Sequence, residues 1–210
     1  MTALYSCLLP EEPIPETVIE RLPDWRRERT ERMKHPGAKK ESLCAGLLFA
    51  RVMALHGVEP NSRVELLPAG KPVFAGNGGV YFSLSHSGEY VLMAISDRPV
   101  GTDVQRCRKV SLSIARRFHP SEQAWLNELP ESERQAGLFR MWVRKEAWVK
   151  AVSGERVLTL EEADVLHGLP GLYFCDYTLP EAHFAALCGE DEGLPQTVIA
   201  VDFGELLREV

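Results

Sequence analysis

The stretch that decides the fold is "FSLSHSGEYVLMAIS", residues 82–96, which is followed almost at once by "VGTDVQ", residues 100–105. Both read as apolar runs typical of buried strands, and the turn residues "SDRP" separate them. Polar side chains interrupt both runs, because Ser85 and His86 lie in the first and Asp103 lies in the second. Polar groups in a strand core need partners, so we expect a site where the two strands meet.

Side-chain alternation predicts which residues of the second strand share a face. Val100, Thr102 and Val104 fall on one side of "VGTDVQ", whereas Asp103 and Gln105 fall on the other. We therefore expect Asp103 and Gln105 to reach the same ligand.

A charged pair stands out in the helix predicted over residues 131–152, the longest in the chain. Glu146 and Lys150 are four residues apart, so they lie on one flank of that helix, one turn apart. An exposed salt bridge is the ordinary interpretation of such a pair. Phe139 and Val143 share the flank of Glu146, however, which predicts a partly enclosed pair whose charges need a metal ion or a phosphate.

The first half of the chain predicts a strand, a long helix and further strands. "ALYSCLL", residues 3–9, has the composition of a strand, and prolines then break the chain. Residues 39–56 have helical spacing, and Gly57 is placed to end that helix. Its predicted apolar stripe consists of Leu43, Leu47, Ala50 and Ala54.

The second half begins near Arg106 and predicts helices followed by strands. A helix with Ser111 or Ser113 as its cap runs to Phe118, and a second short helix starts at Ser121. The long helix follows and ends at Ser153-Gly154. Alternating patterns then predict strands in residues 171–179, 183–188 and 197–203.

The composition is that of an ordinary globular protein. A hydrophobic fraction of 45% and a charged fraction of 26% exclude disordered and fibrous classes. No apolar run approaches the roughly 20 residues of a membrane helix, and residues 1–9 are too short for a secretory signal, so we expect a cytoplasmic protein without membrane contact. The 5 cysteines are widely spaced and include no C-x-x-C pair, so we expect them to be reduced.

The charge distribution is uneven. The net charge of −6 argues against binding to nucleic acid, yet residues 21–41 carry an excess of Lys and Arg. This local excess of cations suits phosphate groups.

Three motifs carry a resemblance to a known family. "FSLSHSGEYVLMAIS", "VGTDVQ" and "RMWVRKEAWVKAVSG", in this order and spacing, resemble the motifs of the 4′-phosphopantetheinyl transferases, specifically the larger, monomeric type that activates peptide synthetases such as surfactin synthetase. The match runs from about residue 39 to residue 154. The resemblance implies an α+β fold of two similar halves related by a pseudo-two-fold, each with a long helix on a small, mostly antiparallel sheet. We expect the halves to be residues 1–102 and 103–210, with the active site between them.

Enzymes of this family move the phosphopantetheine arm of coenzyme A to a serine hydroxyl of an apo acyl or peptidyl carrier protein and release 3′,5′-ADP. The resemblance implies that Asp103, Gln105 and Glu146 bind Mg²⁺, for which oxygen ligands are suited. Lys150 would face the pyrophosphate, and Glu146 would accept the proton of the attacking serine. Asp103, Glu146 and Lys150 are thus the expected catalytic residues.

The resemblance also implies a coenzyme A site. Ser85 and His86 would bind phosphate oxygens, with His86 facing the 3′-phosphate, and Lys71 and Pro72 would lie by the adenine nucleotide. Further 3′-phosphate contacts are expected from Arg26 and Arg29, with Lys39 and Lys40 as competing candidates.

One position departs from the family pattern. Relatives of this type usually carry a second acid two residues after the aspartate, where this chain has Gln105. An amide oxygen can still coordinate Mg²⁺ or hold a ligand water, but it contributes no charge.

Structural roles are the alternatives for each motif. His86 would then be an ordinary structural histidine, the serines would bond a turn backbone, Asp103 would cap a turn, and Arg26 and Arg29 would form a solvated face. Two other function classes also stay open. One is a metal-dependent phosphohydrolase that uses Asp103 and Glu146, and the other is a nonenzymatic anion-binding or nucleic-acid-binding module built on residues 21–40.

Overall fold

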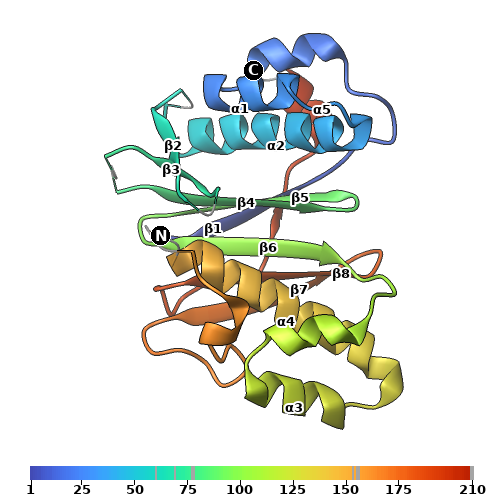
Figure 1. Cartoon of the computed structure of the whole chain (residues 1–210). Coiled ribbons are helices and arrows are strands. Elements are labelled where there is room, and N and C mark those ends of the chain that lie inside the picture. Colours follow the sequence, from blue (N-terminus) through green and yellow to red (C-terminus); the bar gives the residue numbers. More distant parts are fainter. Residues whose placement is uncertain (60, 69, 77–78, 153, 155–156, 209–210) are drawn as a thin grey trace.

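Two β-sheets pack face to face, and helices cover the outer face of each sheet (Figure 1). The computed structural model describes residues 1–59, 61–68, 70–76, 79–152, 154 and 157–208. Within these residues the first sheet has the strand order β4-β5-β1-β9, the second has the order β6-β8-β7, and β2 pairs with β3 in a separate hairpin. The α+β class and the small, mostly antiparallel sheets expected from the sequence are confirmed.

The elements follow one another in two runs. The first run consists of β1 (Ala3–Leu8), η1 (Glu16–Arg21), α1 (Asp24–Glu31), α2 (Pro36–Leu55), β2 (Val64–Leu66), β3 (Pro72–Phe74), β4 (Tyr81–Ser87) and β5 (Tyr90–Ser96). The second run consists of β6 (Val100–Arg106), η2 (Leu112–Arg117), α3 (Pro120–Glu128), α4 (Glu131–Val152), η3 (Leu160–Glu162), β7 (Tyr173–Leu179), β8 (His183–Gly189), β9 (Ile199–Ala200) and α5 (Phe203–Arg208).

Helix α2 begins earlier than its apolar spacing predicts. Pro36 occupies the first turn, where a missing N–H costs nothing, and the His35 ring accepts a hydrogen bond from the Ala38 N–H at 3.3 Å. Gly57 follows the helix with a φ of 67°, as the sequence predicts for a C-terminal cap. Ala54 is exposed and does not extend the buried stripe, because the last turn of α2 faces the core with Val52 and Met53 instead.

The opening stretch forms the β4–β5 hairpin, and β6 follows after a turn. Strand β5 is buried on both faces, since Met93 faces α2 and Leu92 faces the second sheet. The core between the sheets also contains Val100 and Val104 of β6, so the predicted alternation of this strand is confirmed.

Helix α4 lies directly on β6 because of one glycine. A Cβ built on Gly101 would come within 2.0 Å of the Ala147 carbonyl oxygen and 2.4 Å of the Ala151 nitrogen. Only a residue without a side chain permits this approach of strand and helix backbones. The contact sets Asp103 of β6 beside the Glu146 and Lys150 side of α4.

A buried ion pair fixes the far side of α4. Lys145 and Glu122 are both fully buried, and the Lys145 ammonium lies 2.7 Å from a Glu122 carboxylate oxygen. Lys145 also donates to the carbonyl oxygens of Leu160 and Ala163. The lysine next to Glu146 in the third motif is therefore a structural anchor, since removing one partner of such a pair costs several kcal/mol, about 3–5.

Two predictions about element ends are corrected. The segment capped by Ser111 is a 3-10 helix that ends at Arg117, and Pro120 begins the next helix because proline is accepted in a first turn. The predicted strand over residues 197–203 is reduced to β9, and Phe203 already begins α5. Ser153 of the predicted helix end lies outside the described residues.

The chain end returns to the first sheet. Strand β9 pairs in parallel with β1, and Leu206 of α5 is fully buried in the core under α2. The expected division at residue 102 falls inside β6, and residues 199–208 pack with the first run of elements, so the two-half organisation stays a proposal. Among the described residues, no helix has the length and apolar character needed to cross a membrane.

Candidate active site

Alternate serines of β4 join the two sheets. The hydroxyls of Ser83, Ser85 and Ser87 accept hydrogen bonds from the backbone N–H groups of residues 102, 104 and 106 on β6, at 3.0, 3.2 and 3.1 Å. We call this arrangement the serine ladder. The ladder explains the alternate serines of the opening stretch, because they satisfy the backbone N–H groups at one edge of β6, where the two sheets do not pair through their backbones.

Asp103 lies at the centre of the site and is 3% exposed. Its Oδ1 accepts from the Ser85 hydroxyl at 2.6 Å and from the Lys150 ammonium at 2.8 Å. Its Oδ2 accepts from the Gln105 amide at 3.2 Å, so Asp103 and Gln105 share one face as predicted. The ammonium of Lys150 also donates to the Thr102 carbonyl at 3.0 Å, so this lysine spans from α4 to β6. The alternative of an exposed salt bridge between Lys150 and Glu146 is therefore not what the structure shows.

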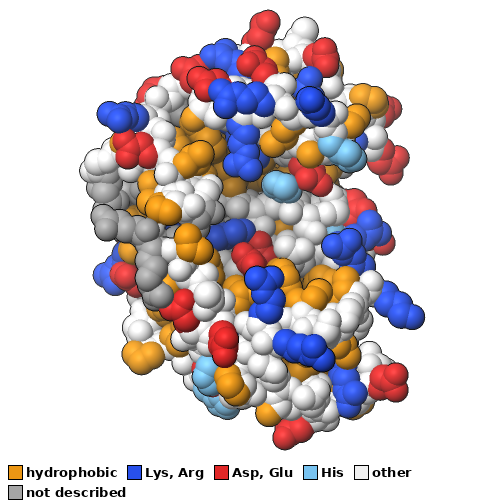
Figure 2. Space-filling model, in the orientation of Figure 1, with side chains coloured by type: hydrophobic (Ala, Val, Ile, Leu, Met, Phe, Trp, Pro, Cys, Tyr) orange, Lys and Arg blue, Asp and Glu red, His pale blue; other side chains and the backbone are white. Residues whose placement is uncertain are grey.

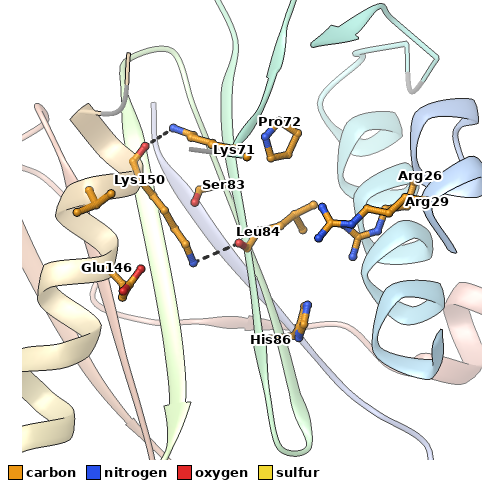
Figure 3. A pocket seen from close by; sticks show the side chains of 11 residues that line it. Arg26, Arg29, Lys71, Pro72, Ser83, Leu84, His86, Glu146 and Lys150 are labelled. Carbon is orange, nitrogen blue, oxygen red and sulfur yellow. Dashed lines mark hydrogen bonds between the residues drawn. The ribbon is translucent and has the colours of Figure 1, made fainter. Parts of the chain in front are cut away.

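A cavity of about 230 Å³ opens beside this centre, where the molecule is hollowed between its upper and lower layers (Figure 2). Figure 3 shows that its walls come from α1 on one side, from α4 on the other and from β4 between them. The lining residues are Arg26, Arg29, Gly70, Lys71, Pro72, Ser83, Leu84, His86, Glu146, Val149 and Lys150.

The α1 side of the cavity carries two guanidinium groups that point inward (Figure 3). Arg26 is only 5% exposed, and burial and then the neighbouring charge of Arg29 lower its pKa to about 10. Its Nε donates weakly to the Ser42 carbonyl at 3.4 Å. Within the described residues no carboxylate pairs with either arginine, so this side presents uncompensated positive charge suited to an anion.

His86 projects from β4 and lines the cavity together with the two arginines (Figure 3). Its Nδ1 is 3.0 Å from a carboxylate oxygen of Glu41 on α2. Burial lowers the pKa of His86, Glu41 opposes this change, and the charges of Arg26, Lys150 and Arg29 add to it.

Lys71 reaches across the top of the cavity. Its ammonium donates to the Val100 carbonyl at 3.1 Å and also to the Lys150 carbonyl. Burial and the charge of Lys150 lower the pKa of Lys71 to about 8. Pro72 follows it along the same wall (Figure 3).

Glu146 faces the cavity from α4 without a direct partner among the described residues (Figure 3). Burial raises the pKa of this carboxyl group, and the negative charge of Asp103 raises it further, against smaller effects of Lys150 and Arg117. The two carboxylates repel each other when both are ionised. Together they offer oxygen ligands of the kind that a divalent cation binds. No group of three or more His, Cys, Asp or Glu side chains suited to a metal occurs in the part of the chain that the structure describes.

Most of the predicted site residues line this cavity, but several do not. Ser85 turns away from the cavity, because its hydroxyl is used by Asp103 and by the serine ladder. Lys39 pairs with Glu16 at 3.0 Å, and Lys40 donates to the Glu11 carbonyl at 3.0 Å, both beside a different hollow. The structure therefore favours Arg26 and Arg29 over the two lysines as partners of an anion in this cavity.

Two contributors were not predicted. Glu41 has no role in the site predicted from the sequence, because nothing in its local sequence indicates a contact with a residue 45 positions later. Ser83 lines the cavity and belongs to the serine ladder, and the available signal was the alternation of Ser83, Ser85 and Ser87 at every second position.

Comparison with known proteins decides the family. Residues 99–199, which include β6 and α4 with the carboxylates of the site, match the 4′-phosphopantetheinyl transferase superfamily. The chain is similar to this superfamily over these residues, and its similarity to one 4′-phosphopantetheinyl transferase extends over most of the chain. It is 26% identical to the 4′-phosphopantetheinyl transferase Sfp of Bacillus subtilis over 197 residues, which cover 87% of this chain and 88% of that protein.

Two shorter matches to phosphopantetheinyl transferases agree. The chain is 36% identical over 74 residues to 4′-phosphopantetheinyl transferase gsp of Aneurinibacillus migulanus, with 35% of this chain and 31% of that protein covered. It is 34% identical over 128 residues to 4′-phosphopantetheinyl transferase HetI of Nostoc sp., with 57% of this chain and 54% of that protein covered. The resemblance expected from the three motifs is thus confirmed at the level of the superfamily and of the enzyme class that these relatives share.

Proposed function

We propose that this protein transfers the 4′-phosphopantetheine arm of coenzyme A to a serine hydroxyl of an apo carrier protein and releases 3′,5′-ADP. One observation carries the proposal, namely that the cavity has two separate groups of charged side chains. Arg26 and Arg29 form a cationic group on the α1 side, and the described residues offer it no carboxylate partner. Lys150 and Glu146 lie on the α4 side, where Lys150 contacts Asp103 of β6 next to the cavity. Coenzyme A carries its 3′-phosphate and its pyrophosphate at two such separate positions.

The α1 side suits the remote phosphate. Arg26, Arg29 and His86 would bind the 3′-phosphate, since guanidinium groups match phosphate geometry and their burial strengthens the attraction. Lys71 and Pro72 would lie beside the adenine nucleotide. Lys150 would face the pyrophosphate as a point charge.

The α4 side suits a divalent cation. Asp103 and Glu146 would hold Mg²⁺, with Gln105 as a neutral ligand or as a hydrogen-bond partner of a ligand water, and the raised pKa of Glu146 is consistent with a site that gains from a cation. When bound, the cation neutralises charge on the phosphoryl oxygens.

The transfer itself makes one bond and breaks one bond. The serine oxygen of the carrier attacks the β-phosphorus, the bond from that phosphorus to the bridging oxygen breaks, and 3′,5′-ADP leaves with the bond electrons. The serine proton passes to Glu146, directly or through water, because a carboxylate whose pKa is raised is a better proton acceptor. Lys150 neutralises the charge that develops on the leaving phosphate.

Mass spectrometry of carrier proteins tests the proposal. The protein is mixed with coenzyme A, Mg²⁺ and a panel of apo acyl and peptidyl carrier proteins, and we expect at least one carrier to gain the mass of the phosphopantetheine group. Asp103→Ala and Glu146→Ala should abolish this gain while circular dichroism stays unchanged. Hydrolysis of coenzyme A without any carrier would instead identify a phosphohydrolase, and failure of every carrier would contradict the proposal. The monomeric state, the cytoplasmic location and the lack of nucleic-acid binding stay predictions.

A further inference from the structure

We propose that Glu41 is a positioning residue, which acts through His86 and makes recognition of the 3′-phosphate of coenzyme A depend on the uptake of a proton. The inference rests on the proposed function, because it assumes that His86 and the two arginines bind this phosphate. It adds a residue from α2, an element that supplies no other group to the site described above.

The geometry ties the two side chains together. A Glu41 carboxylate oxygen lies 3.0 Å from Nδ1 of His86, and the side chains of His86 and Glu41 are 40% and 28% exposed. Within the described part of the chain, no residue hydrogen-bonds the other ring nitrogen, Nε2. His86 itself lines the cavity with Arg26 and Arg29. One nitrogen therefore lies in ion-pair contact with Glu41, and the other is available to a ligand.

Elementary acid–base chemistry gives the consequence of this contact. An ionised carboxylate only accepts hydrogen bonds, so its position favours a proton on Nδ1. A neutral imidazole has a single N–H, and Nε2 then carries a lone pair that repels a phosphate oxygen. A phosphate dianion also offers only acceptors. His86 can donate to the phosphate and keep its contact with Glu41 only as the doubly protonated imidazolium.

The surrounding charges favour neutral His86 before the ligand binds. The groups that act on the ring are Glu41 from α2, Arg26 and Arg29 from α1 and Lys150 from α4, and burial together with the three cations lowers its pKa below the ordinary value. Glu41 is the one group named here that favours the charged ring. A bound phosphate adds negative charge, which raises the pKa of His86, so a proton is taken up from solvent on binding.

Calorimetry detects this proton directly. Binding of coenzyme A and of 3′-dephospho-coenzyme A is measured between about pH 6.5 and 8.5 in buffers of different ionisation enthalpy, which gives the number of protons taken up. We expect coenzyme A to take up more protons than its dephospho form, with a difference of up to about one proton per site. Any contribution of Lys71 is common to both ligands and cancels in this difference.

Variants separate the roles of the two side chains. His86→Asn should abolish the difference in proton uptake between the two ligands. Only the protons exchanged by the 3′-phosphate itself, which ionises near pH ~6, should remain. Glu41→Gln keeps the shape and removes the charge, so the affinity for coenzyme A should fall off at a lower pH than in the wild type, whereas 3′-dephospho-coenzyme A should show no such shift. Glu16→Gln, which removes an exposed carboxylate paired with Lys39, is the matched control and should leave both profiles unchanged.

Three outcomes would overturn the inference. The first is equal proton uptake with the two ligands. The second is a Glu41→Gln variant whose affinity for coenzyme A depends on pH as in the wild type. The third is a Glu41→Gln variant that binds both ligands more weakly by the same factor at every pH, which would mark a merely structural role. Failure of the proposed function looks different, because then coenzyme A is not bound or no carrier is modified. A protein that binds and transfers normally without the difference in proton uptake would refute the role of Glu41 alone.

Discussion

Asp103 is a single residue that connects several parts of the site. Its two oxygens accept from a serine of β4, a lysine of α4 and an amide of its own strand, so every hydrogen bond that it makes joins it to another part of the site. Neither oxygen is left to bind a cation without competition. Binding of Mg²⁺ would therefore require Lys150 or Gln105 to give way, which links metal affinity to the partners of Asp103.

A carboxylate at position 105 should strengthen metal binding. In Gln105→Glu the hydrogen bond from the amide to Asp103 is replaced by repulsion between two carboxylates, so the metal-free protein should melt a few degrees lower, roughly 2–4 °C. Mg²⁺ should restore the melting temperature and support half-maximal transfer at a lower concentration than in the wild type. Thermal unfolding with increasing Mg²⁺ measures this, and Gln105→Met serves as the control without added charge. An unchanged Mg²⁺ dependence would place residue 105 outside the metal site.

The ammonium of Lys71 should impose a pH dependence at the alkaline end. With a pKa of about 8, this lysine is charged below that pH and loses its charge as the pH rises through it. Affinity for 3′-dephospho-coenzyme A, which lacks the phosphate that His86 would bind, should therefore fall through this range, and Lys71→Met should lack the fall. Binding titrations over the range test this, with the exposed Lys34→Met as control. A fall that persists in Lys71→Met would assign it to another group.

Two serine-to-alanine substitutions test the serine ladder, which joins strand β4 to strand β6. Ser83 and Ser87 accept the same kind of bond from β6, but the first bond is buried and the second is exposed. Ser83→Ala leaves a buried N–H of Thr102 unsatisfied and should lower the free energy of unfolding by about 1–3 kcal/mol. Ser87→Ala should cost less than about 0.5 kcal/mol, because water replaces the hydroxyl. Urea unfolding measures both, and equal losses would contradict the role given to burial.

The contact of β6 with α4 should tolerate no side chain at position 101. Gly101→Ala places a methyl group against the backbone of α4, so helix and strand must separate, with a loss of at least about 3 kcal/mol. Gly154→Ala is the matched control, because nothing lies within 4 Å of its Cβ position. Unfolding by urea compares the two variants. A Gly101→Ala protein as stable as the wild type would show that the two elements can separate at little cost.

The elements were predictable where the pattern is local. The β4–β5 hairpin, β6 and α4 follow from alternation, helical spacing and turn residues within single segments. The strand predicted over residues 197–203 is too long and hides the start of helix α5, because these residues alternate like a longer strand. Only pairing with β1 and burial of Leu206 decide where the strand stops. Tertiary contacts, which no local pattern contains, override propensity there.

The site was predictable to the extent that its residues belong to motifs. Asp103, Glu146, Lys150 and His86 lie together as their motifs imply. The side to which Ser85 points was not predicted, because an alternating strand has two faces and the sequence does not say which one meets β6. Glu41 was missed for a similar reason, since its contact with His86 depends on how α2 packs over the first sheet.

For the molecule as a whole, we expect the two sheets to unfold in one cooperative transition. The sheets share a core, the serine ladder joins their edges, and the chain end returns to the first sheet. In Trp25→Phe the remaining tryptophans all lie in the second run of elements, so their fluorescence reports that part while far-ultraviolet circular dichroism reports the whole. We expect coincident urea midpoints for the two signals. A fluorescence change that is complete at lower urea would show that the second part unfolds independently.

The return of the chain end to the first sheet has a consequence for dividing the protein in two. A cut in the exposed turn at Asp97 would leave the first fragment without β9 and α5, which belong to the second fragment. Each fragment would then display an apolar surface that only the other can cover, and Arg21 of the first would regain the carbonyl oxygens of Leu206 and Leu207 on reassembly. We therefore expect the two fragments to reassociate when mixed, because each covers the apolar surface that the other exposes.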